Sequence, residues 1–232
     1  MAYATLICTL DSASAPPTSP DGGPEMHCYD ASIPGEQPVL LELRAKPGSK
    51  LQEALAATTV GSRIMACGFL TTLDTEEIGQ RPVISVCVIC PATKDQFLNE
   101  VSLVGRVGGE ARSAEKSAKV PVAMNRYRKN PDDPEGDPIE ETDWIGVRGF
   151  GFVKGKIEKL AKGTLIEVAG SLSQMTNAKK LPFFEVRARS LRSHGKGKSR
   201  GNAVAPKSTS AVGYSADDFE DNGDGDIGGG WD

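Results

Sequence analysis

TDWIGVRGFGFVKGKIEKLAKGTLIEVAGSL, residues 142–172, contains two strand patterns with a short helical pattern between them. Aromatic and β-branched residues through 144–150 suit a half-buried strand. Apolar residues then recur at helical spacing over 153–161, while lysines and a glutamate fill the other face. Gly163 stands where a glycine cap ends a helix, and residues 165–172 return to strand chemistry. The stretch therefore predicts strand, helix, strand.

The same pattern occurs earlier in the chain. GSRIMACGFL at 61–70 aligns with GTLIEVAGSL at 163–172, an offset of 102, and Pro82 and Pro182 each precede a last strand. Strand, short helix, strand is the middle of a five-stranded OB barrel, which binds single strands on one face. Such self-similarity indicates two barrels in tandem. The alternative is that two strand–helix–strand patterns coincide by chance.

The first half supplies the remaining elements of one barrel. Strands are expected at 5–10, 26–29, 38–44, 61–70 and 82–90, with a short helix at 51–57. The fold class is therefore all-β: two tandem five-stranded OB-fold barrels, each with a short capping helix, plus a disordered acidic C-terminal tail. The expected domains are 1–98, 99–192, and a Gly/Lys-rich linker with the acidic tail at 193–232.

The charge of the chain is unevenly distributed. The net charge is −4, and the seven acidic residues of the last segment leave the rest at +3. A mildly basic body is compatible with nucleic acid, although the bulk pI is 5.4. The sequence shows no signal-peptide pattern and no apolar run of membrane-spanning length, and its five cysteines are an odd number. We expect a cytoplasmic protein without a membrane segment.

Four motifs in the second half resemble bacterial single-stranded-DNA-binding proteins. They are VSLVGRVG at 101–108, VAMNRY at 122–127, TDWIGVRGFG at 142–151 and LAKGTLIEVAGSL at 160–172. The resemblance to the two-domain members implies sequence-independent binding of single-stranded DNA in replication, recombination and repair. It also implies a homodimer that presents four OB domains.

The family's base-stacking positions fall on Tyr127, Trp144 and Phe150 of this chain. Trp144 and Phe150 are six residues apart and so share one face of a regular strand. A further family aromatic falls near Asn177 and is missing. The alternative is that these rings pack in a core, as aromatic residues on strands often do.

Cations near these rings are candidates for phosphate contacts. The family's basic residue after the tryptophan falls on Gly146, with Arg148 as a possible substitute. The candidate ssDNA-binding cations are Arg106, Arg126, Arg128, Lys129, Arg148, Lys179, Arg187 and Arg189. Many of them could individually belong to an ordinary solvated surface.

The acidic tail is the candidate partner-binding segment. In the family, an acidic terminus with an apolar tip recruits replication and repair proteins, and here the tip is Trp-Asp. The candidate residues are Asp217, Asp218, Phe219, Glu220, Asp221, Trp231 and Asp232. The alternative is a tail that only improves solubility; the exposed tryptophan argues against it.

The N-terminal barrel departs from the family pattern, because Val39, Leu40 and Leu41 stand where the second barrel has Trp144. We expect it to bind DNA weakly or to serve in dimerisation. Cys87 and Cys90 with His27 and Cys28 could hold zinc, but buried cysteines are the favoured interpretation.

No metal triad, phosphate loop or nucleophile elbow is present in the sequence, so we expect no enzyme, no metal and no cofactor. Two alternative functions stay open. One is an OB-fold adaptor of the primosome type with weak nucleic-acid affinity, and the other is an RNA-binding OB module.

Overall fold

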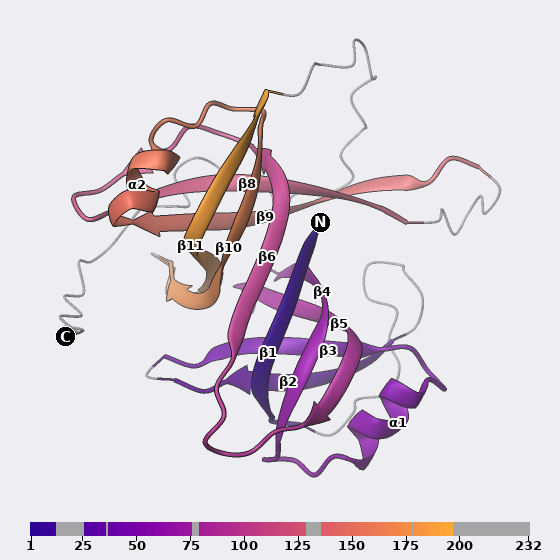
Figure 1. Cartoon of the computed structure of the whole chain (residues 1–232). Coiled ribbons are helices and arrows are strands. Elements are labelled where there is room, and N and C mark those ends of the chain that lie inside the picture. The colour runs from indigo at the N-terminus through magenta and orange to yellow at the C-terminus, as the bar shows by residue number, and fades with distance from the viewer. Residues whose placement is uncertain (13–25, 36, 76–78, 129–135, 178, 197–232) are drawn as a thin grey trace.

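A computed structural model describes residues 1–12, 26–35, 37–75, 79–128, 136–177 and 179–196 (Figure 1). The chain is mostly β, which confirms the all-β fold class. The first six elements are β1 (Ala2–Leu10), β2 (His27–Ile33), β3 (Val39–Ala45), α1 (Lys50–Ala57), β4 (Arg63–Thr75) and β5 (Gly79–Pro91). The others are β6 (Asn99–Val107), β7 (Arg112–Ser113), β8 (Ser117–Arg128), β9 (Ile139–Phe150), α2 (Gly151–Ile157), β10 (Thr164–Thr176) and β11 (Pro182–Lys196).

The strands form two closed rings. In the first, the order is β2-β3-β5-β4-β1, and β1 pairs back to β2 through Thr9↔Ser32 and Leu10↔Ala31. In the second, the order is β6-β10-β11-β9-β8, and β6 pairs back to β8 through Arg106↔Ala123. We call the first ring the N-terminal barrel and the second the C-terminal barrel. In each, the helix lies between the third and fourth strands of the ring in chain order.

Period-two alternation places the core inside each ring. In β6, every second residue from Val101 to Val107 is buried, and the residues between them are exposed. Successive strand side chains point to opposite faces, so one face of β6 packs inward and the other meets solvent. The core of the C-terminal barrel also takes residues from its other strands, including Val120, Ile145, Val168 and Phe184.

The helices are short, and each begins in a defined way. Ser49 caps α1 by accepting a hydrogen bond from the Gln52 N–H at 3.2 Å, and Leu55 packs into the core. The second helix begins at Gly151 and ends at Ile157, so it is shorter than the 153–161 pattern predicted. Gly163 does not cap it. With φ of 84°, Gly163 instead makes the turn into β10, and its N–H bonds to the Val107 carbonyl.

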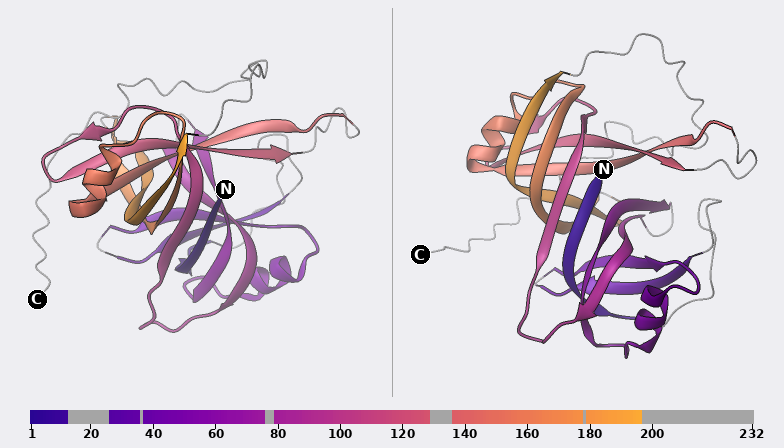
Figure 2. Two further views of the ribbon diagram at one scale, coloured as in Figure 1. Left: turned by 45° about the horizontal axis from the view of Figure 1, so that its top comes forward. Right: turned by 45° about the vertical axis from the view of Figure 1, so that its right-hand side comes forward.

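The two barrels are joined through their first strands. β1 and β6 pair antiparallel from Ala2↔Leu103 to Leu6↔Asn99, and the terminal ammonium of Met1 donates to the Val104 carbonyl at 2.7 Å. Figures 1 and 2 show β1 and β6 side by side at the centre of the molecule. The sheets of the two barrels are therefore continuous across this pair of strands.

Glycines at equivalent positions of the two barrels make a close backbone contact. The pairing register shifts between Cys67 and Gly68 in β4, and between Ala169 and Gly170 in β10. A Cβ at Gly68 would lie 2.1 Å from the Ser85 carbonyl oxygen, and one at Gly170 would lie 2.1 Å from that of Arg187. The two glycines that align in the sequence repeat therefore both lie at β-bulges, where a side chain has no room.

Some boundaries differ from the expectation. β11 continues to Lys196, paired with Thr164, so Ser193–Lys196 is ordered strand and not the start of the tail.

Cys8 is buried, and desolvation raises the pKa of its thiol to about 12. Cys87 is exposed, so the interpretation of buried cysteines is wrong for this residue.

Gly68→Ala and Gly170→Ala should each lower the free energy of unfolding by about 3 kcal/mol, because the added methyl group collides with backbone. Gly155→Ala is the control: it lies within α2 with nothing within 4 Å of an added Cβ. This change should raise the free energy of unfolding by about 0.5–1 kcal/mol. Urea unfolding curves measure all three. A Gly170→Ala protein as stable as the unmodified chain would contradict the role given to the bulge.

Candidate nucleic-acid interface

Three rings lie on the outward face of β8 and β9. Tyr127, Trp144 and Phe150 are 66%, 43% and 42% exposed. In the β8–β9 pairing, Tyr127 is opposite Glu140, Ala123 opposite Trp144, and Ser117 opposite Phe150, with no shift of register. Residues 140, 144 and 150 are separated by even numbers, so all three rings share one face. We call this surface the aromatic face.

The inward positions of the same strands explain why the rings point out. Ile145 and Val147 of β9, and Val120 and Val122 of β8, are almost fully buried. These β-branched residues fill the barrel interior and fix the register of both strands. A core role for Trp144 and Phe150, the alternative interpretation, is therefore wrong.

Trp144 lies against a glycine that follows β6. A Cβ on Gly108 would be 2.1 Å from Cζ3 and 2.7 Å from Cη2 of the Trp144 indole. The Gly108 N–H is held by the Pro121 carbonyl at 2.9 Å, so this glycine is fixed beside β8. The indole thus has one side against backbone, while 43% of the residue stays exposed.

Arg106 and Arg187 lie on the same outward face. Arg106 pairs with Ala123, which in turn pairs with Trp144, so the three residues form one cross-strand row. Arg106 donates to the Gly163 carbonyl at 3.2 Å and is exposed. The Arg187 guanidinium stands over the Phe150 ring, 5.3 Å from its centroid. These two predicted cations therefore lie on the same face as the aromatic rings.

Arg148 is tied to a buried carboxylate. Its Nε donates to Glu185 Oε1 at 2.7 Å, and the Glu185 side chain is fully buried while that of Arg148 is 13% exposed. Lys119 Nζ lies 3.4 Å from the other Glu185 oxygen. A Cβ on Gly146 would come within 2.8 Å of Lys119 Cε. Arg148 therefore stabilises the junction of β9 and β11, and the missing side chain at Gly146 leaves room for Lys119.

Arg126 and Arg128 occupy the other face of β8 from Tyr127. Arg126 pairs with Glu141 at 2.8 Å and with Asp143 at 3.2 Å. Burial raises the pKa of Asp143 above its ordinary value, and the Arg126 charge offsets only part of that effect. Neither arginine joins the aromatic face, because alternate residues of a strand point to opposite sides.

The remaining predicted residues are either exposed on the surface or outside the described part of the chain. Lys179 is exposed in the turn between β10 and β11, and Arg189 is paired with Glu100 at 3.0 Å, both side chains being more than half exposed. Such a surface pair contributes little and leaves Arg189 able to exchange partners. Lys129 and the tail residues Asp217, Asp218, Phe219, Glu220, Asp221, Trp231 and Asp232 lie outside the described residues.

The C-terminal barrel matches a known family in sequence. Residues 98–182 match the sequence model of the "Single-strand binding protein family", a span from the start of β6 to the start of β11. This segment belongs to the single-strand binding protein family. No curated protein matches the chain.

Solved structures extend the likeness to both barrels. The wild-type single-stranded DNA binding protein of Thermus aquaticus is 18% identical, with a TM-score of 0.57, over 89% of this chain and 98% of that chain. A deletion mutant of the same Thermus aquaticus protein gives 18% identity and a TM-score of 0.57 over 87% and 98%. At this identity the likeness shows the fold.

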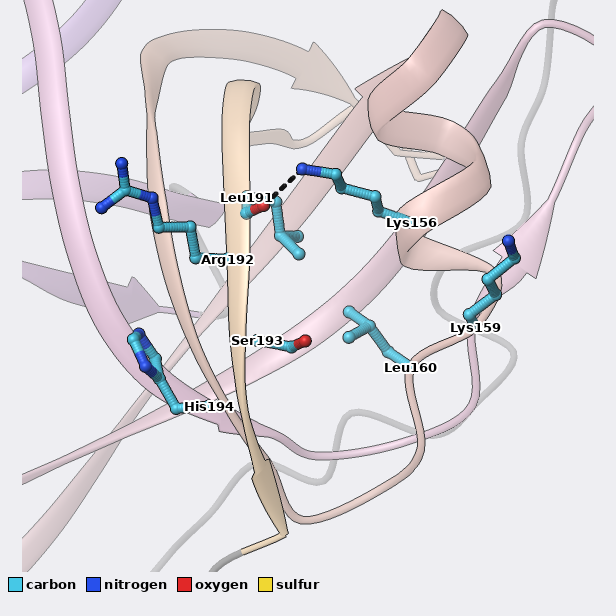
Figure 3. Close-up of a pocket in the computed structure, with 7 residues that line it drawn as sticks. All are labelled: Lys156, Lys159, Leu160, Leu191, Arg192, Ser193 and His194. Atoms are coloured by element: carbon cyan, nitrogen blue, oxygen red, sulfur yellow. Dashed lines mark hydrogen bonds between the residues drawn. The ribbon is translucent and has the colours of Figure 1, made fainter.

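A surface pocket of about 500 Å³ lies between α2 and β11 (Figure 3). Its apolar residues are Leu160 and Leu191, and its polar ones are Lys156, Lys159, Arg192, Ser193 and His194. Lys156 Nζ donates to the Leu191 carbonyl at 3.0 Å, and His194 pairs with Glu167 at 3.4 Å. The two lysines and the arginine make the lining of this pocket positively charged.

Sequence reasoning missed several residues at this interface. Phe152 is 79% exposed on α2, with Lys156 Nζ 4.7 Å from its ring centroid. Lys119 stands over Phe183 at 4.6 Å. The residue pair Phe152 and Lys156, at i and i+4 of a helix, was readable from the sequence. The contacts of Lys119 depend on tertiary structure, so no local sequence pattern predicts them.

Within the described residues, neither helix is long and apolar enough to cross a membrane.

Gly108→Ala should displace the Trp144 indole, because the new methyl group would overlap the ring. The chain has two tryptophans, so the measurement uses a Trp231→Phe background in which Trp144 is the one tryptophan. We expect a shifted emission maximum and easier quenching by acrylamide. The stability change should stay near 1 kcal/mol or below, since an exposed ring can move aside.

Gly109→Ala is the matched control, because its Cβ would meet Pro121 Cγ at 3.3 Å and not Trp144. Equal fluorescence in the Gly108→Ala and unmodified proteins would contradict the contact.

Proposed function

We propose that this protein binds single-stranded DNA without sequence preference and protects it during replication, recombination and repair. The observation that carries the proposal is the aromatic face: three exposed rings on one side of β8 and β9, with Arg106 and Arg187 among them. The sequence-family match of residues 98–182 and the Thermus aquaticus fold support the same function. The proposal contains no catalytic step, no metal and no cofactor.

The chemistry of the face suits unpaired bases. Base–aromatic stacking contributes about 1–3 kcal/mol per base and tolerates any base, because every base has a π-face. Residues 140 to 150 of β9 span about 33 Å at about 3.3 Å per residue, so the rings can engage separate bases of one strand. Arg106 and Arg187 are placed to contact the phosphates between them.

The N-terminal barrel has a different surface, which supports a role in dimerisation. Tyr3 and Phe69 pack edge to face, 5.8 Å between centroids, and are 39% and 44% exposed. Val88 and Val104 extend this patch across β5, β4, β1 and β6. An exposed apolar patch of this kind is typical of a protein interface. We propose a homodimer with four OB domains, and a solution mass near one chain of 24.5 kDa would overturn it.

The C-terminal segment and the cell compartment complete the proposal. We propose that the acidic tail with its Trp231 tip recruits replication and repair proteins, since acidic residues flanking an aromatic ring suit a basic pocket with an apolar floor. The compartment is then the cytoplasm, at the nucleoid, where single-stranded DNA is exposed. An OB-fold adaptor with weak DNA affinity is the alternative, and DNA affinity distinguishes the two.

Trp144→Ala and Tyr127→Ala should each weaken binding to poly(dT) by about tenfold, which corresponds to about 1.4 kcal/mol. Phe97→Ala is the control, since Phe97 is 64% exposed but lies on the linker between the barrels. It should leave the affinity unchanged. Fluorescence anisotropy of labelled DNA at several salt concentrations measures the affinities.

The slope of affinity against salt should be the same in all four proteins, because the phosphate contacts are kept. Two outcomes contradict the proposal. One is affinity of the Trp144→Ala and Tyr127→Ala proteins equal to the unmodified chain, and the other is tighter binding of a matched RNA than of DNA.

A further inference from the structure

The hairpin of β4 and β5 reaches from the N-terminal barrel to the strand that carries Trp144. Gln80 of β5 donates from Nε2 to the Trp144 carbonyl at 3.1 Å. Thr72 of β4 donates to Asp143 Oδ1 twice, from Oγ1 at 3.1 Å and from its N–H at 3.4 Å. Two consecutive residues of β9 are thus bonded by the other barrel.

These bonds attach to β9 just before the part of the strand that pairs with β11. The parallel pairing of β11 with β9 runs from Gly146 to Gly149. The Trp144 carbonyl lies beyond the end of this pairing, and Gln80 supplies its hydrogen-bond partner. Without that bond, a strand edge next to the indole would rely on water.

A close backbone contact holds the hairpin in place. Gly79 has φ of 71°, and a Cβ there would lie 2.3 Å from the Pro182 carbonyl oxygen and 3.3 Å from Leu181 Cβ. Pro182 begins β11 of the C-terminal barrel. The hairpin therefore packs against the start of β11 while its side chains bond to β9.

The contact to Asp143 is buried. Asp143 is 6% exposed, and Arg126 Nε lies 3.2 Å from its second oxygen. A buried carboxylate needs such partners, since an unmade hydrogen bond in the interior is costly. Thr72 and Arg126 approach it from different barrels, so Asp143 links the two barrels directly behind Trp144.

A hydrogen bond from β3 to β10 also joins the two barrels, away from Trp144. Gln174 Oε1 of β10 accepts from the Leu40 N–H of β3 at 2.8 Å, so the C-terminal hairpin also reaches the third strand of the other barrel. The residue held there is a leucine, 42% exposed, and not an aromatic ring. Loss of this bond would loosen the same pair of barrels without touching Trp144.

We propose that Thr72 and Gln80 are positioning residues for Trp144. Gln80 holds the Trp144 carbonyl and Thr72 holds the Asp143 carboxylate, so that the indole stays over Gly108 with its free side toward solvent. The N-terminal barrel thereby takes part in single-strand binding through the ring of its neighbour. The inference rests on the proposed function for its DNA consequence, but the position of the ring is testable without DNA.

The test is a Thr72→Val/Gln80→Ala double variant in the Trp231→Phe background. In the free protein we expect a shifted Trp144 emission maximum and faster local motion in time-resolved anisotropy. With poly(dT), we expect less quenching and affinity reduced about fivefold, because two modest hydrogen bonds are lost. The salt slope should not change, since no phosphate contact is removed.

Gln174→Ala is the matched control and should leave Trp144 emission, anisotropy and poly(dT) affinity as in the unmodified chain. Thr72→Ser keeps the hydroxyl and should also behave like the unmodified chain. Should the double variant unfold, Gln80→Ala alone tests the contact, because the Gln80 side chain is only partly buried.

Unchanged Trp144 fluorescence in the free double variant would overturn the positioning role, as would an equal change in Gln174→Ala. Failure of the proposed function is a separate result. If Trp144→Ala binds poly(dT) like the unmodified chain, the proposed function is wrong. A shift of Trp144 fluorescence in the DNA-free double variant would still support the positioning role.

Discussion

The antiparallel pairing of β1 with β6 is the contact on which the arrangement of both barrels depends. Each of these strands is shared between its own ring and the other barrel, from Ala2↔Leu103 to Leu6↔Asn99. The pairing sets the barrels at a fixed distance and angle, so each long hairpin meets the third strand of the other barrel. Loss of this ladder would separate Thr72 and Gln80 from β9 and expose the edges of two strands.

The two barrels share a fold but present different surfaces. In the C-terminal barrel, the outward positions of β8 and β9 carry rings and cations, whereas the equivalent strand β3 carries Leu40 and a buried Glu42. Apolar inward positions fix the register in both, and the outward positions are then free to differ. This division explains how one repeated fold supports a proposed DNA face in one half and a proposed dimer face in the other.

The sequence repeat and strand alternation predicted most of what is local. The sequence repeat aligns Gly68 with Gly170, and both lie at β-bulges. The even spacing of Trp144 and Phe150 predicted their common face. The sequence did not predict which cations lie beside the rings. Arg126 and Arg148 are near the rings in sequence, yet one lies on the far face of β8 and the other pairs with buried Glu185. Partners distant in the chain, such as Thr72 for Asp143, decide these cases, and no local pattern reveals them.

Ultraviolet cross-linking of the full chain to oligo(dT), followed by peptide mapping, identifies the rings that contact single-stranded DNA. Stacked thymines react with the rings that they touch, so we expect cross-links at Tyr127, Trp144 and Phe150, all exposed on one face. Cross-links confined to Tyr3 and Phe69 of the N-terminal barrel, with none on β8 or β9, would contradict it.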